Sequence, residues 1–205
     1  MPNQKQIEAV LPLYSPILYL HPDEEYLPSS VNWFFSNGAL LYKKDDESNP
    51  VSIAQNGTNL PQDPNNDGAY WIDLPADDAN KDRVKQGKQG NLESAETYVH
   101  VKPMFGGTFT DFTMWVFYTF NGHGRAKVKF LNIKLGKIGE QVGDWEHVTL
   151  RVSNFDGKLY QIYFSQHSSG QWIDSSQIEF QNDGSNDFDF PTRRPVVLVL
   201  DLCIP

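Results

Sequence analysis

A short glycine-containing turn between two alternating apolar runs constrains the fold of this chain more than any other feature. The turn is Phe155-Asp156-Gly157, and a three-residue loop with glycine in the left-handed conformation joins antiparallel strands. A slip of one residue would move every apolar side chain to the opposite side of the sheet. The predicted pairs are Val152 with Tyr160, Leu150 with Ile162, and Val148 with Phe164. The segment 144–173 therefore predicts a hairpin with one apolar face.

The same register places two acidic residues at the end of the first strand, on its apolar side. Asp144 and Glu146 alternate with Val148 and would lie opposite Ser168 and Gln166. A carboxylate pair that faces a core is too costly to leave bare, because charged groups lose their hydration there. The pair must therefore be hydrated at a cleft mouth, protonated, paired with a cation or bound to a metal ion.

These carboxylates are candidate metal ligands, because two of them on one strand face can converge on a hard cation such as Ca²⁺ or Mg²⁺. We expect Asp144 and Glu146 to bind the metal, with His21 and Asp23 completing the site if the fold brings them near. A structural role stays open, in which the carboxylates pair with arginine or backbone amides and Pro22-Asp23-Glu24 forms a turn. A general acid and base pair also stays open, although the sequence identifies no nucleophile beside it.

The opposite side of the same strand carries candidate binding residues. Trp145 and His147 lie there, and the register places His167 across from Trp145. Because cross-strand ring pairs stabilise a sheet, we expect His167 to pack on Trp145. The three residues then predict a binding surface.

Strand-like segments separated by turn residues recur along the rest of the chain. Aromatic residues make up 13% of the sequence and fit the pleated, half-buried surface of a sheet. Strands are expected over 10–21, 69–74, 96–101, 108–119 and 126–135, and an exposed helix over 77–89. Residues 22–42 hold a second strand or a short helix capped by Ser29, and 43–95 are mostly loop. This pattern predicts a mostly β protein, a β-sandwich with long loops and one or two short helices.

Charge and hydropathy exclude several classes of partner. The net charge is −9, and an acidic surface repels phosphate backbones, so we expect no nucleic-acid partner. The same charge disfavours electrostatic docking on anionic lipid. No apolar run approaches the roughly 20 residues of a membrane span, and the polar N-terminus shows no signal peptide.

The single cysteine, Cys203, excludes an intrachain disulfide and fits a reducing compartment.

Several segments together resemble the plant family of vacuolar protein sorting-associated protein 62. They are Asp67-Gly68-Ala69-Tyr70-Trp71-Ile72-Asp73-Leu74-Pro75, Ile138-Gly139-Glu140-Gln141-Val142-Gly143-Asp144-Trp145-Glu146-His147, Tyr163-Phe164-Ser165-Gln166-His167-Ser168, and residues 14–16, 21–35, 100–103 and 110–122. The resemblance implies a role connected with vacuolar protein sorting. Gln141 stands where the family has histidine, and the tail 198–205 replaces a segment with further histidines. We therefore expect one incomplete domain over residues 1–205, truncated at its C-terminus.

A second, local resemblance concerns the acidic strand end. Gly143-Asp144-Trp145-Glu146-His147-Val148 is similar to the end of the Gly-His-Arg-His-Asp-Trp-Glu heptapeptide of necrosis- and ethylene-inducing-like cytolysins. Those proteins are β-sandwiches that hold a divalent cation with the carboxylates and a histidine of the motif. The resemblance implies that Asp144 and Glu146 are metal ligands, while the motif's histidine positions fall on Gln141 and Gly143.

Together these features predict a non-enzymatic binding or trafficking-related protein with an unknown protein or lipid partner. We expect it to be cytoplasmic or peripherally associated with the vacuole. Two alternatives stay open. One is a cation-dependent module that binds membranes or glycolipids, as the cytolysin resemblance implies, and the other is a hydrolase that uses Asp144 and Glu146 as paired carboxylates.

Overall fold

A computed structural model describes most of the chain in two compact units. It covers residues 2–22, 24–66, 68–75, 80–123, 125–128, 131–134, 138–166, 169–182 and 193–199. The first unit comprises Met1–Pro22, Thr97–Trp115 and Glu146–Leu200. The second comprises mainly Asp23–Glu96 and Val116–Trp145.

The chain begins with a helix, α1 (Gln4–Tyr14), where a strand was expected from residue 10. Its first turn is closed by a capping box, in which Asn3 and Gln6 each bond the other's backbone N–H. Pro12 lies inside the helix, where it removes a backbone donor, and the helix ends two residues later. The expected strand is confirmed only for β1 (Ile17–Leu20).

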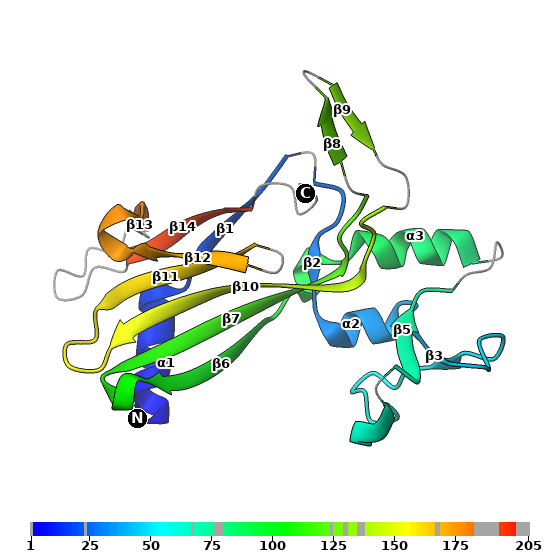
Figure 1. The fold of residues 1–205 in the computed structure, drawn as a ribbon, viewed down its shortest axis with the longest axis horizontal. Helices are drawn as coiled ribbons and strands as arrows, with labels where there is room; N and C mark the ends of the chain where they lie inside the picture. The colour runs from blue at the N-terminus through cyan, green and yellow to red at the C-terminus, as the bar shows by residue number, and fades with distance from the viewer. Residues whose placement is uncertain are drawn as a thin grey trace. The chain divides into compact units, whose positions relative to one another are not determined.

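The main sheet of the first unit is built from the long strands of the chain. They are β6 (Thr97–Met104), β7 (Phe109–Phe120), β10 (Val142–Ser153), β11 (Leu159–Gln166) and β12 (Ser169–Asp174). Their order is β12-β11-β10-β7, with β6 also paired to β7 (Figure 1). In the second unit β2 (Pro28–Ser29) pairs with the end of β7, which brings the sheet to six strands.

One face of this sheet forms the core of the first unit. Its buried side chains are Phe112, Met114, Val148, Leu150, Val152, Leu159 and Ile162. The helix α1 covers this face with Ile7, Val10, Leu11 and Tyr14, which recur at the spacing of one helix side. A small sheet adds Leu18 from β1 and Phe180 from β13 (Phe180–Asn182), joined by β14 (Arg193–Val199). The core of this unit therefore lies between strands on one side and strands plus α1 on the other.

The predicted hairpin register holds in the strands and fails near the turn. Val148 pairs with Phe164 and Leu150 with Ile162, as predicted. Val152 pairs with Leu159 instead of Tyr160, because a bulge shifts the register after Arg151. The bulge places Leu159 in the core and leaves the larger Tyr160 with its polar hydroxyl exposed. Gly157 adopts the left-handed conformation, φ 69°, as the turn prediction required.

The second unit combines short strands with two helices. They are β3 (Leu40–Lys43), β4 (Val51–Ser52), β5 (Tyr70–Asp73), the hairpin β8 (Arg125–Val128) and β9 (Leu131–Lys134), α2 (Val31–Ser36) and α3 (Lys81–Gln89). Ser30, not Ser29, caps α2, because its hydroxyl accepts the Trp33 N–H at 3.0 Å. The expected single strand over 126–135 is instead the hairpin β8–β9.

The mostly β class predicted from the sequence is confirmed. The described residues form three α-helices instead of one or two, with short 3₁₀ turns at Pro64–Asn66, Leu92–Ser94, Phe105–Gly107 and Ser175–Gln177. Within the part of the chain that the structure describes, no helix has the length and apolarity needed to cross a membrane.

Candidate functional site

The main sheet of the first unit carries a second, polar and aromatic set of side chains on the face opposite the core. Because side chains alternate along a strand, the residues between the core positions all point to this face. We call it the aromatic face. It comprises Asp111, Thr113 and Trp115 from β7, His147, Thr149 and Arg151 from β10, Tyr163 from β11, and Trp172 from β12.

Four rings follow one another across the strands of the aromatic face. The centroids of Trp115 and His147 are 4.3 Å apart, and His147 stacks on Tyr163 at 5.7 Å with planes 16° apart. Tyr163 in turn lies 5.3 Å from Trp172, its directly paired neighbour on β12. All four rings are half-buried, so part of each ring surface stays in contact with solvent. Ring contacts therefore link four strands of the main sheet, β7, β10, β11 and β12.

An ion pair anchors one end of the row. The Arg151 guanidinium donates two hydrogen bonds of 2.8 Å to the carboxylate of Asp111. Its central carbon also lies 4.0 Å from the centroid of the Trp172 ring and 4.8 Å from that of Phe105. A bidentate pair together with two cation–π contacts holds the guanidinium in place, and the guanidinium in turn positions Trp172.

His147 lies inside the row, between Trp115 and Tyr163, in an environment that favours its neutral form. Burial lowers the pKa of its imidazole from the ordinary value of 6.5, because the charged form loses hydration. Its Nδ1 lies 3.5 Å from the Thr149 hydroxyl, which also contacts the Thr113 hydroxyl at 3.1 Å. A neutral imidazole offers both a donor and an acceptor to a ligand on this face.

The position of Tyr163 depends on a glycine on the neighbouring strand. A Cβ built on Gly170 would collide with the phenol ring of Tyr163 and with the carbonyl oxygen of Phe164. The absence of a side chain at Gly170 therefore leaves room for the phenol ring of Tyr163 on β12.

Two of the predicted metal ligands, Asp144 and Glu146, lie two positions apart on β10. Glu146 accepts a hydrogen bond of 3.0 Å from the Ser165 hydroxyl. Both are half-buried, and His21 is exposed. Asp23 lies outside the described residues, among which no group of three His, Cys, Asp or Glu side chains could hold a metal ion.

The Ca²⁺ or Mg²⁺ site therefore stays a prediction. Its direct test is a rise in melting temperature with added divalent cation that the Asp144→Asn variant abolishes. The described pairing of β10 with β11 runs from Val148 with Phe164 to Val152 with Leu159, so the alignment of Asp144 with Ser168 and of Glu146 with Gln166 stays a prediction.

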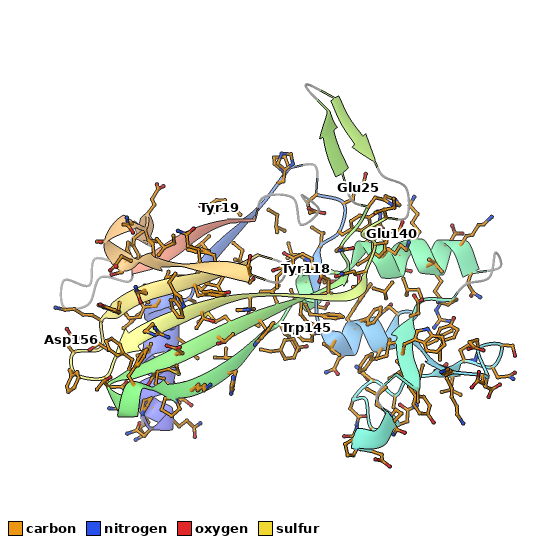
Figure 2. All side chains as sticks on the ribbon, viewed as in Figure 1. Tyr19, Glu25, Tyr118, Glu140, Trp145 and Asp156 are labelled. Carbon is orange, nitrogen blue, oxygen red and sulfur yellow. The ribbon has the colours of Figure 1, made fainter. Side chains whose placement is uncertain are left out.

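Of the predicted binding residues, His147 belongs to the first unit, Trp145 belongs to the second, and His167 lies outside the described residues. His147 lies in the aromatic face, as described above. Trp145 belongs to the second unit and packs against Phe117 at 4.9 Å, with part of its ring exposed (Figure 2). His167 lies outside the described residues, so its packing on Trp145 stays a prediction.

Sequence reasoning missed most of the aromatic face, although a signal was present. Residues 111–115 and 147–151 both alternate core residues with polar or aromatic ones, and both have threonine at the centre. Matching these two alternating triplets would have placed Asp111 near Arg151 and Trp115 near His147. Trp172 and Tyr163 follow from the predicted hairpin and its neighbouring strand.

Comparison with known proteins identifies a family. The model of a protein family described as vacuolar protein sorting-associated protein 62 matches residues 1–193. No curated protein and no solved structure matches the chain.

Proposed function

The chain belongs to the vacuolar protein sorting-associated protein 62 family, and from this membership we propose a non-catalytic binding protein of protein sorting whose aromatic face holds a sugar ring of a glycan. The observation that carries the proposal is the row of four half-buried rings from Trp115 to Trp172 on the face opposite the core. A role in sorting is supported by the description of the family, and the ligand class by the chemistry of the face.

A sugar ring suits this face because it presents flat patches of C–H groups edged by hydroxyls. Aromatic rings offer a large apolar surface with a negative π-face to such C–H groups. Ligand sites in general combine apolar and aromatic lining with a few fixed polar groups. Here the polar groups are the Tyr163 hydroxyl, the neutral His147 imidazole and the Thr113–Thr149 hydroxyl pair.

The face is also held in place before any ligand arrives, which lowers the entropic cost of binding. The Asp111–Arg151 pair fixes the guanidinium on which Trp172 lies. Both oxygens of the Asp111 carboxylate accept bonds from Arg151, which supports a structural role over a role as general base.

The proposal is tested by probing a glycan array with the labelled full-length chain. Wild-type protein is expected to bind a subset of glycans, and Trp172→Ala and Tyr163→Ala are each expected to weaken that binding by tenfold or more, which is about 1.4 kcal/mol. Trp71→Ala is the matched control, because Trp71 is a partly exposed tryptophan that stacks on Tyr42 in the second unit. The proposal fails if the wild type binds no glycan, or if all variants that keep the wild-type melting temperature bind equally.

A further inference from the structure

Exposed aromatic residues gather on two turns at one end of the main sheet in the first unit. One is the β6–β7 turn with Phe105, and the other is the β10–β11 turn with Phe155 (Figure 1). The exposed fraction is 83% for Phe155, 62% for Phe105 and 49% for Tyr160. Phe109 joins the set, with its ring centroid 6.1 Å from Phe105 and 5.1 Å from Tyr160. We call these four residues the aromatic tip; Asp156, labelled in Figure 2, marks the turn that carries Phe155.

Hydrogen bonds join the two turns, so the fold itself holds the turns that carry the exposed rings. The backbone N–H of Asn154 donates to the Thr108 carbonyl, and its side-chain amide donates to the Gly107 carbonyl, each at 2.9 Å. Its side-chain oxygen accepts a bond of 2.9 Å from the Thr110 hydroxyl. One asparagine from the second turn therefore fixes three residues of the first.

The backbone of Phe105 is in a strained conformation. Its φ is 49°, in the left-handed region that a bulky residue rarely adopts. Such a conformation costs on the order of 1–3 kcal/mol and tends to persist where function requires it. Gly106 and Gly107 follow with φ of 66° and 86°, which glycine adopts without strain, so Phe105 carries the strain of this turn.

The tip is electrically neutral in a chain that carries a net charge of −9. Residues 104–110 contain no charged side chain, and residues 153–160 contain only Asp156 and Lys158. These two form an exposed ion pair of 3.6 Å and cancel. A neutral, aromatic end on an acidic protein matches the interface of a zwitterionic bilayer, because it needs no cationic patch to approach the headgroups.

From these observations we propose that the aromatic tip docks the protein on zwitterionic lipid, with Phe105 and Phe155 entering the interface between headgroups and acyl chains. Aromatic side chains are favoured at that depth, and binding there scales with the apolar area that leaves water. Tyr160, whose ring contacts Phe109, carries a hydroxyl that suits the headgroup level. This docking is independent of the proposed glycan site.

The experiment is flotation of the full-length chain with phosphatidylcholine vesicles. Phe155→Ser is expected to lower the partition coefficient about tenfold, because one phenylalanine loses its burial in the interface. Phe155 is almost fully exposed, so this variant is expected to keep the wild-type melting temperature. Partition should change little with added NaCl, since screening weakens ionic contacts and leaves apolar ones intact.

Ile138→Ser is the matched control, because Ile138 is 68% exposed and belongs to the second unit. Its partition should equal that of the wild type. A reporter variant, Phe155→Trp, should lose fluorescence with brominated phosphatidylcholine beyond the loss seen for the wild type.

Three results would overturn the proposal. The first is no flotation of the wild type with phosphatidylcholine, and the second is flotation that appears only with anionic lipid and disappears with salt. The third is a wild-type dimer in light scattering that Phe155→Ser converts to a monomer, with no effect of the substitution on flotation. That result would show that the aromatic tip is a dimer interface.

Discussion

The guanidinium of Arg151 donates two hydrogen bonds of 2.8 Å to the two carboxylate oxygens of Asp111. The two residues are 40 positions apart and join β10 to β7 on the aromatic face. Each side chain is about one-tenth exposed, so the pair is largely withdrawn from water. A pair of this kind holds the strands in place and also supports the ring of Trp172.

Removing the acidic partner should be costly, because Arg151 would be left buried without its counter-ion. Asp111→Asn is expected to lower the free energy of unfolding by about 3 kcal/mol, measured as a shift of the urea midpoint. Replacing both partners with apolar residues, Asp111→Leu with Arg151→Met, should recover most of the loss. Asp156→Asn breaks the exposed pair with Lys158 and serves as the control, with little change expected. Equal effects of Asp111→Asn and Asp156→Asn would contradict the importance of the buried pair.

His147 should make stability depend on pH. Burial lowers the pKa of its imidazole below the ordinary 6.5, so the unfolded chain binds more protons than the folded one as the pH falls. The contribution of His147 to stability is full above about pH 6.5 and is lost as the pH falls through the folded-state pKa. Urea denaturation at about pH 7.5 and about pH 5 should show a smaller decline for His147→Gln than for the wild type.

The control for this experiment is His100→Gln, because His100 is exposed on β6. It should reproduce the decline of the wild type. If the free energy of unfolding falls equally with pH in the wild type and in His147→Gln, then His147 does not cause the pH dependence of stability.

The close approach of Tyr163 to Gly170 predicts a penalty for any side chain at that glycine. Gly170→Ala would push a methyl group into the Tyr163 ring and the Phe164 carbonyl, and should cost about 1–3 kcal/mol of unfolding free energy. In a Tyr163→Ala background the penalty should fall, because the ring is gone, but not vanish, because the carbonyl remains. A thermodynamic cycle of the four proteins measures the coupling, and full additivity would show that the two residues are not in contact.

The link between the two turns of the aromatic tip depends on the side chain of Asn154. Asn154→Ala removes the bonds to Gly107 and Thr110 and should lower the free energy of unfolding by about 2 kcal/mol. Asn49→Ala is the comparison, because Asn49 bonds to Asp46 in an exposed turn of the second unit. Its effect should be several-fold smaller, and a larger effect there would refute the link.

The sequence contains the signal for helix α1, although it also favours a strand over part of the same residues. Ile7, Val10, Leu11 and Tyr14 lie at helical spacing, and Asn3 with Gln6 forms a capping box. The apolar, β-prone character of residues 10–21 instead favours a strand there. The tertiary packing of one helix side on the core outweighs this preference, because propensity is weak compared with the burial of an apolar face.

The sequence by itself determined the class of the fold and the register of the hairpin between Val148 and Arg151, because alternation with period two leaves one pairing that buries the apolar side. The bulge after Arg151 places Leu159 in the core instead of Tyr160. Which of the two side chains is buried depends on packing within the core, and the local sequence pattern does not predict it. Only the tertiary structure decided the aromatic face and the aromatic tip. Both depend on which distant strands and turns lie side by side. The matching alternation of residues 111–115 and 147–151 makes the Asp111–Arg151 pair conceivable, but it does not specify that β7 lies beside β10.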